Sequence, residues 1–218
     1  FTPYDRMFPT IESDTNETVL KELRALGTRV ELMEADFMDS HAPARVMSDA
    51  VEKFTHVDIL VVNHVHDTLK TFDELTADEI DKHLTVNVRA SLLMIQQFSK
   101  QHDGRSGGRI VLLTSGQHLG PMPHMAYVAS KGALHQLTMS LSDYFIGKGI
   151  TVNTVNPGPT KTYTPSEEVN DWVMKHMPQG RWGEPDDAGR LVAWLVSDDA
   201  RWITGQVINS EGGIRSHE

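Results

Sequence analysis

The chain has 218 residues, enough for one domain with a substantial hydrophobic core. Its formal net charge of −10 argues against nucleic acid or an anionic membrane as its main partner. The chain contains no cysteine and no apolar run near the roughly 18 residues of a spanning helix, so we expect a cytoplasmic protein without disulfides, thiolate metal sites or membrane contact.

The first half of the chain alternates predicted helices and strands. A leucine stripe predicts a helix over residues 14–27, and Gly27 is a typical stop. "RVELMEAD", residues 29–36, is predicted to be a strand. Residues 42–54 then predict a second helix, and the apolar run at 57–63 predicts a buried strand.

A capping box opens the next predicted helix. In "TADE", residues 76–79, Thr76 can accept a hydrogen bond from a free backbone amide while Glu79 reaches back. We expect one long helix from this box to about residue 101, with Asn87 in its middle.

The second half continues the same alternation, in which "TPSE" at 164–167 begins a short helix with Pro165 in its first turn. The other predicted elements are a strand at 108–115, a helix at 124–145, a strand at 150–156, a helix at 184–197 and a strand at 205–213. The strands show little apolar–polar alternation, which is typical of strands covered on both faces. The pattern therefore predicts an α/β fold with a doubly wound parallel sheet.

Polar residues follow several predicted strands at their carboxyl ends. They are Asp36, Asn63, Ser115 and Asn156. Ligands of such sheets bind beyond the carboxyl ends of the strands, so these side chains are expected to lie near one site.

Two tyrosine–lysine pairs share the same spacing. "YVASK" places Tyr127 and Lys131 on one helix face, shortly after the strand that ends at Ser115. A phenol with a pKa near 10 is a poor acid–base catalyst at neutral pH, and lowering that pKa to about 7 requires about 4 kcal/mol. One ammonium at about 4 Å supplies an energy of that size. "YFIGK", with Tyr144 and Lys148, lies at the far end of the helix, and we expect it to be structural.

Seven motifs occur in an order that resembles the short-chain dehydrogenase/reductase family. They are "ADFMD", "DILVVNHV", "TVNVRA", "GRIVLLTSGQ", "YVASK", "ITVNTVNPGPTKT" and the segment from "GRWGEP" to "NSEGG". The resemblance covers residues 29–213 and looks closest to bacterial 3-oxoacyl-carrier-protein reductase-like members. It implies a single Rossmann-like domain over residues 1–218, with three αβα layers, in a homodimer or homotetramer.

The same resemblance implies an NAD(P)-dependent oxidoreductase, such as a carbonyl reductase, that moves hydride between nicotinamide and a small carbonyl or alcohol substrate. Tyr127 would be the acid/base, and Lys131 would lower its pKa and bind the nicotinamide ribose. Ser115 would orient the substrate carbonyl, and Asn87 would hold a water molecule in a proton relay.

The resemblance also assigns cofactor contacts. Asp36 and Phe37 would flank the adenine, Asn63 and His64 would line its ribose side, and Pro157, Gly158 and Thr160 would contact the nicotinamide end. NADP is slightly preferred over NAD; Arg6 could meet a 2′-phosphate or could simply be an exposed arginine.

The loop between Ser115 and Tyr127 is expected to contact the substrate through Gln117, His118 and His124. We expect no metal, because the spacing of the histidines at 64, 66, 118 and 124 fits no preferred zinc pattern.

The chain departs from the family pattern at its beginning. It carries no TGxxxGxG phosphate loop, so we expect the family's first strand and first helix to be missing and the domain to be incomplete at its N-terminus. Two alternatives stay open for that reason. One is a halohydrin dehalogenase-like lyase without coenzyme, although such enzymes have arginine in place of Lys131. The other is a non-catalytic nucleotide-binding protein.

Overall fold

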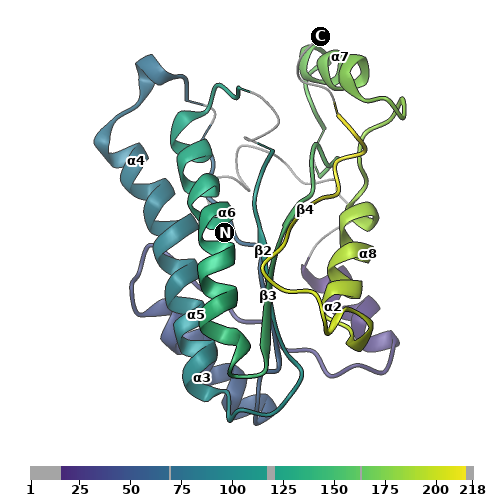
Figure 1. Ribbon diagram of the computed structural model, residues 1–218. Helices are drawn as coiled ribbons and strands as arrows, with labels where there is room; N and C mark the ends of the chain where they lie inside the picture. The colour runs from purple at the N-terminus through teal and green to yellow at the C-terminus, as the bar shows by residue number, and fades with distance from the viewer. Residues whose placement is uncertain (1–15, 69, 117–120, 163, 215–218) are drawn as a thin grey trace.

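A computed structural model describes residues 16–68, 70–116, 121–162 and 164–214 (Figure 1). Its four described strands form one parallel sheet in the order β1-β2-β3-β4. The strands are β1 (Ile59–Val62), β2 (Gly108–Leu113), β3 (Ile150–Asn156) and β4 (Val207–Asn209). Because all four run in the same direction, their carboxyl ends meet at one edge of the sheet.

Helices cover both faces of this sheet, as Figure 1 shows. One face carries α3 (Ala42–Phe54), α4 (Ala77–His83), α5 (Ala90–Gln101) and α6 (Met125–Ile146), and the other carries α8 (Pro185–Leu195) with α2 (Asn16–Ala25) on the same side. The remaining described α- and 3₁₀-helices are η1 (Phe72–Glu74), α7 (Glu167–His176) and η3 (Asp198–Ala200). The predicted three-layer, Rossmann-like α/β fold is therefore confirmed. None of the described helices is long and apolar enough to cross a bilayer.

The core lies on both sides of the two central strands. All of β2 and β3 is buried. Ile110 and Leu112 of β2 pack in one cluster with Phe98 of α5, whereas Val111 packs with Leu195 of α8 in a second cluster. Apolar side chains on both faces explain why the sequence of these strands does not alternate.

The helix that was expected to be uninterrupted contains a π-helical segment, η2 (Leu84–Arg89), between α4 and α5. Asn87 lies in this segment, and π-helical turns are frequent at functional sites. At the start of α4, Thr76 accepts the predicted hydrogen bond from the Glu79 amide, at 3.2 Å. The Glu79 carboxylate, however, accepts a 2.6 Å bond from Thr68 Oγ1.

The predicted strand at residues 29–36 and the predicted start of the helix at residues 164–167 are wrong, and the last strand, predicted at 205–213, is only Val207–Asn209. Residues 29–36 form no strand, because no other segment of the described chain pairs with their backbone. The edge of β1 away from β2 is likewise unpaired among the described strands. The helix predicted to begin with Pro165 in its first turn is α7, which begins after Ser166. Ser166 Oγ accepts from the Val169 amide at 3.3 Å, so Ser166 is the N-cap and Pro165 precedes it.

Candidate active site

Lys131 lies on α6 with its amino group enclosed by protein. The residue is 3% exposed, and Nζ donates a 2.9 Å hydrogen bond to the carbonyl oxygen of Leu113, the last residue of β2. Burial lowers the pKa of Lys131 to about 8, although the Asp67 carboxylate acts in the opposite direction. An ammonium group has three donors, so one bond to Leu113 leaves capacity for a ligand at this end of the sheet.

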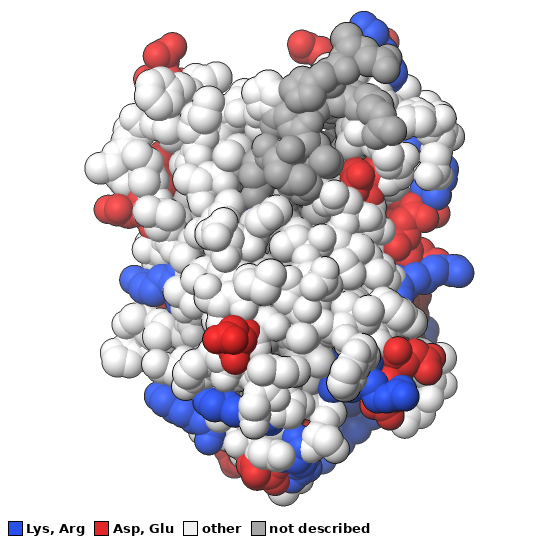
Figure 2. Space-filling model, in the orientation of Figure 1, with Lys and Arg blue, Asp and Glu red and all other residues white. Residues whose placement is uncertain are grey.

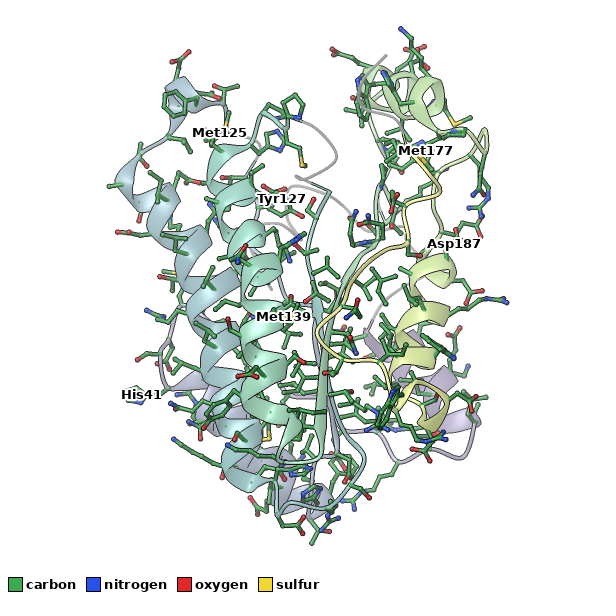
Figure 3. All side chains as sticks on the ribbon, viewed as in Figure 1. His41, Met125, Tyr127, Met139, Met177 and Asp187 are labelled. Carbon is green, nitrogen blue, oxygen red and sulfur yellow. The ribbon has the colours of Figure 1, made fainter. Side chains whose placement is uncertain are left out.

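Tyr127 lies in the first turn of α6, one turn before Lys131 (Figure 3). Thr114, the residue after β2, donates from Oγ1 to the Lys131 carbonyl at 2.9 Å. The next residue, Ser115, lies with its Oγ 3.9 Å from the Met122 sulfur. The first contact holds the end of β2 against α6 at Lys131, one helical turn from Tyr127, so Ser115 lies near the part of α6 that carries both residues.

Asn87 is fully buried and uses its side-chain amide to join three segments. Its Nδ2 donates to the His66 carbonyl at 2.9 Å and to Ser130 Oγ at 2.8 Å, while Oδ1 accepts from the His66 amide at 2.7 Å. Ser130 Oγ then donates to the Tyr127 carbonyl at 2.8 Å. The amide of Asn87 therefore fixes the loop after β1 and the first turn of α6 relative to each other.

The second tyrosine–lysine pair is placed differently. Tyr144 is 63% exposed near the end of α6, and Lys148 Nζ lies 4.1 Å from the centre of its ring, as a cation–π contact. This arrangement agrees with the structural role that the sequence predicted for the pair.

Three of the residues assigned to the adenosine side line one hollow. A cavity of about 390 Å³ is bordered by Phe37, Asn63 and His64 together with residues of β1. The rings of Phe37 and His64 lie 4.4 Å apart, and burial lowers the pKa of His64 to about 4, so its imidazole is neutral. Asp36 does not line this hollow, and its Oδ1 accepts from the Met38 amide at 2.8 Å.

The loop after β3 is held by short polar contacts. Asn156 Oδ1 accepts from the Gly158 amide at 3.1 Å, and Thr160 Oγ1 donates to the Pro157 carbonyl at 3.2 Å. Gly158 has φ +65°, and a Cβ there would lie 2.3 Å from the Glu211 Cβ. Only glycine fits this conformation and this close approach.

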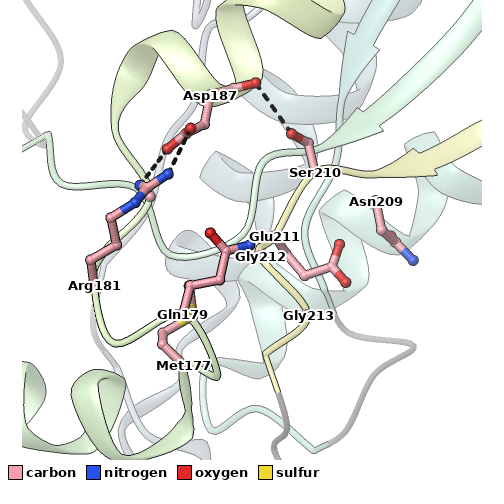
Figure 4. Close-up of a pocket in the computed structure, with 10 residues that line it drawn as sticks. Met177, Gln179, Arg181, Asp187, Asn209, Ser210, Glu211, Gly212 and Gly213 are labelled. Carbon is pink, nitrogen blue, oxygen red and sulfur yellow. Dashed lines mark hydrogen bonds and ion pairs between the residues drawn. The ribbon is translucent and has the colours of Figure 1, made fainter.

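A second hollow, of about 210 Å³, lies beside this loop (Figure 4). Arg181 pairs with Asp187 in it through two contacts of 2.7 and 3.0 Å, and the guanidinium lowers the pKa of Asp187 to about 2. The other lining residues are Met177, Gln179, Gly183, Asn209, Ser210, Glu211, Gly212 and Gly213. The sequence reading named none of these residues as contacts.

The predicted substrate contacts are only partly described. Gln117, His118 and Arg6 lie outside the described residues. His124 is half-buried at the N-cap of α6, next to the turn that carries Tyr127. Ser130 was missed, although its position three residues after Tyr127 and one before Lys131 places it on the same turn of the helix.

Comparison with known proteins adds independent observations. A family model described as enoyl-(acyl carrier protein) reductase matches residues 7–215. The uncharacterized oxidoreductase YjdA of Bacillus subtilis is 40% identical over 201 residues, which span 91% of this chain and 80% of that protein.

Solved structures agree with this match. A short-chain dehydrogenase from Burkholderia cenocepacia in complex with NADP is 34% identical, with a TM-score of 0.84 over 90% of this chain and 81% of that chain. A short-chain dehydrogenase/reductase from Serratia marcescens is 30% identical, with a TM-score of 0.83 over 92% of this chain and 84% of that chain.

Proposed function

This chain belongs to the short-chain dehydrogenase/reductase family, and from that premise we propose that it moves hydride between NADP(H) and a small carbonyl or alcohol, with Tyr127 exchanging the proton. The observation that carries the proposal is the buried amino group of Lys131 at the carboxyl end of β2, one helical turn from Tyr127. A buried cation without a full set of partners is costly, so its retention points to a ligand or a reaction that uses it.

The described residues fit a nicotinamide coenzyme in three places. The hollow beside Phe37, Asn63 and His64 offers aromatic and polar groups for an adenosine. The amino group of Lys131 has donors for ribose hydroxyl groups. The loop after β3 is fixed by the close packing of Gly158 on Glu211, so its backbone is held in place for contact with the nicotinamide end.

The bound coenzyme would supply the hydride, and the protein would supply the proton and the geometry. The positive charge of Lys131 favours the ionised form of a neighbouring phenol, so Tyr127 can give its proton to an alkoxide and take it back in the reverse direction. The hydroxyl group of Ser115 would hold the substrate oxygen between them. Through its hydrogen bond to Ser130, Asn87 would hold the first turn of α6 in position. The proposal also includes a role for Asn87 in holding a water molecule of the proton relay.

The preference for NADP rests on the Burkholderia structure, which was solved with NADP. The test is titration of the full chain with NADPH and with NADH, followed by the fluorescence of its four tryptophans. We expect saturable quenching that is tighter with NADPH, and NADPH-dependent reduction of members of a carbonyl panel. No response to either coenzyme, together with halide release from a halohydrin, would replace the proposal with the lyase alternative.

We also propose that the protein is a homo-oligomer through the face formed by α5 and α6. Figure 2 shows that the middle of the face in view carries few charged residues. Met139 on α6 is 66% exposed, and Leu92 on α5 is 37% exposed. Sedimentation of the protein and of Met139→Glu tests this surface. We expect the wild type to be a dimer or tetramer and the variant to dissociate.

A further inference from the structure

Four metal-ligating side chains gather outside the set assigned to hydride transfer. His66 and Asp67 follow β1, whereas Glu79 and His83 lie one turn apart on α4. One ligand atom from each of His66, Glu79 and His83 lies within 4.8 Å of the other two. Asp67 Oδ1 lies 3.7 Å from His83 Nε2, so the carboxylate joins the same cluster.

The two histidines of the cluster are buried, and three of its polar atoms lack hydrogen-bond partners. His66 is 3% exposed and His83 is 0% exposed. The Nε2 atoms of both rings and Oδ1 of Asp67 are buried without a hydrogen bond. Each such atom costs about 1–3 kcal/mol if it stays unpaired. One cation between them would satisfy all three.

The surrounding groups already orient these side chains as a metal requires. His83 Nδ1 donates to the Glu79 carbonyl at 2.7 Å, which leaves the lone pair of a neutral imidazole on Nε2. The Glu79 carboxylate is held by Thr68, and the backbone of His66 is held on both sides by the amide of Asn87. Metal ligands in proteins are commonly fixed by such outer contacts.

We propose that His66, Asp67, Glu79 and His83 bind one divalent cation of the zinc class. Two imidazole nitrogens with carboxylate oxygens suit Zn²⁺, whereas Mg²⁺ and Ca²⁺ prefer oxygen ligands alone. The two carboxylates also balance the charge of a divalent ion. The bound ion would tie the loop after β1 to α4 and so support the position of Asn87.

A simpler arrangement would use the same residues without a metal. A protonated His83 could form an ion pair with Asp67, and their separation of 3.7 Å is compatible with one. That arrangement leaves His66 Nε2 without a partner and gives Glu79 no part in the cluster. The metal site accounts for both residues.

The experiment titrates the chelator-treated full chain with Zn²⁺ and with Mg²⁺ by calorimetry, and measures Tm with and without Zn²⁺. The variants are His83→Gln and Glu79→Gln, with His41→Gln as the control, since His41 is exposed at the start of α3 (Figure 3). We expect one Zn²⁺ per chain, a rise in Tm, no matching response to Mg²⁺, and affinity at least about tenfold weaker in both cluster variants.

His41→Gln should bind Zn²⁺ as the wild type does. The proposal is wrong if the wild type takes up no Zn²⁺, or if both cluster variants bind it with unchanged affinity. If His83→Gln does not fold, Glu79→Gln alone decides between these outcomes. A loss of stability in His83→Gln that is the same with and without Zn²⁺ would contradict the metal site.

Discussion

The side-chain amide of Asn87 donates a 2.8 Å hydrogen bond to Ser130, and this bond joins the π-helical segment η2 to α6. Ser130 in turn donates to the carbonyl of Tyr127. The first turn of α6 is therefore positioned from the neighbouring helix, and Ser130 gives Asn87 a route by which to influence Tyr127.

Asn87→Ala should lower both stability and turnover. It leaves the buried amide and carbonyl of His66 unpaired and removes one of the two hydrogen bonds of Ser130 Oγ, so we expect a loss of about 2–4 kcal/mol in the free energy of unfolding. Asn153→Ala is the matched control, because Asn153 is also buried and also bonds to backbone groups, those of Ile203 and Gln206.

Urea unfolding and steady-state kinetics separate the two variants. Both should lose stability, but only Asn87→Ala should lose kcat at a temperature where each variant is folded. Equal kcat values in the two variants would reduce Asn87 to a purely structural residue.

Lys131→Met should stabilise the fold while removing activity. Burial lowers the pKa of Lys131 from 10.5 to about 8, so keeping its amino group charged at pH 7 costs the wild type about 3 kcal/mol of stability. The variant avoids this cost but loses about 1 kcal/mol with the hydrogen bond to Leu113. The wild type should itself gain stability as the pH rises from 8 towards 10.5, because the unfolded chain binds more protons in that window.

Lys148→Met is the control for that experiment, since Lys148 is exposed beside Tyr144. It should change neither the free energy of unfolding at pH 7 nor turnover by much. Loss of stability in Lys131→Met would show that the interactions of the amino group outweigh the cost of burying it.

Gly158→Ala tests the close approach of the loop after β3. Gly158 and Gly180 have nearly the same positive φ, +65° and +64°, but only at Gly158 would a Cβ meet another residue, at 2.3 Å. We expect Gly180→Ala to cost about 1 kcal/mol from backbone strain, and Gly158→Ala about 1–3 kcal/mol more.

The two glycine variants are compared by urea unfolding and by NADPH titration. Only Gly158→Ala should weaken coenzyme binding, because only its loop is assigned to the nicotinamide. The same loss of stability in both variants would mean that the contact with Glu211 relaxes freely.

His64 should make the protein sensitive to acid. Burial lowers its folded-state pKa from 6.5 to about 4, so its contribution to stability is complete above pH 6.5 and is lost as the pH falls towards 4. The loss reaches about 3 kcal/mol. His64→Gln, which can still donate to the Val86 carbonyl, should show a flatter dependence between these pH values.

The unfolding free energy of the wild type, His64→Gln and the exposed-residue control His41→Gln should be measured from pH 4 to pH 7. The control should follow the wild type. Identical curves for all three proteins would contradict a neutral, buried imidazole at position 64.

Much of the fold could be predicted from the sequence because period and length distinguish its elements well. The helices at 42–54 and 125–146 and the strand at 150–156 lie where the apolar pattern placed them. The strand prediction for residues 29–36 failed for a physical reason. A strand requires a backbone partner, and the sequence of the strand itself does not specify that partner. The predicted start of the helix at 164–167 is two residues too early, since Ser166 is the N-cap in place of Thr164.

The site was predictable where its residues share one helix, and less so where they meet across the fold. The spacing of Tyr127 and Lys131 predicted that they share one face of a helix. The hydrogen bond from Lys131 to Leu113 could not be predicted in this way, because it depends on how α6 packs on β2. The cluster at 66, 67, 79 and 83 was not predicted, because the spacing of His66 was compared with that of the histidines at 64, 118 and 124 and not with the helix that carries Glu79 and His83. A glutamate and a histidine four apart on one helix were the available signal.

The central claim, proton exchange by Tyr127, is tested most directly by comparing Tyr127→Phe with Tyr144→Phe in NADPH-dependent carbonyl reduction. Each change removes one hydroxyl group from α6, but only Tyr127 lies beside Lys131 at the end of β2. We predict that kcat falls by roughly 10²–10⁴-fold in Tyr127→Phe, while coenzyme affinity is kept and Tyr144→Phe turns over as the wild type does. Turnover of Tyr127→Phe within about tenfold of the wild type would contradict the mechanism.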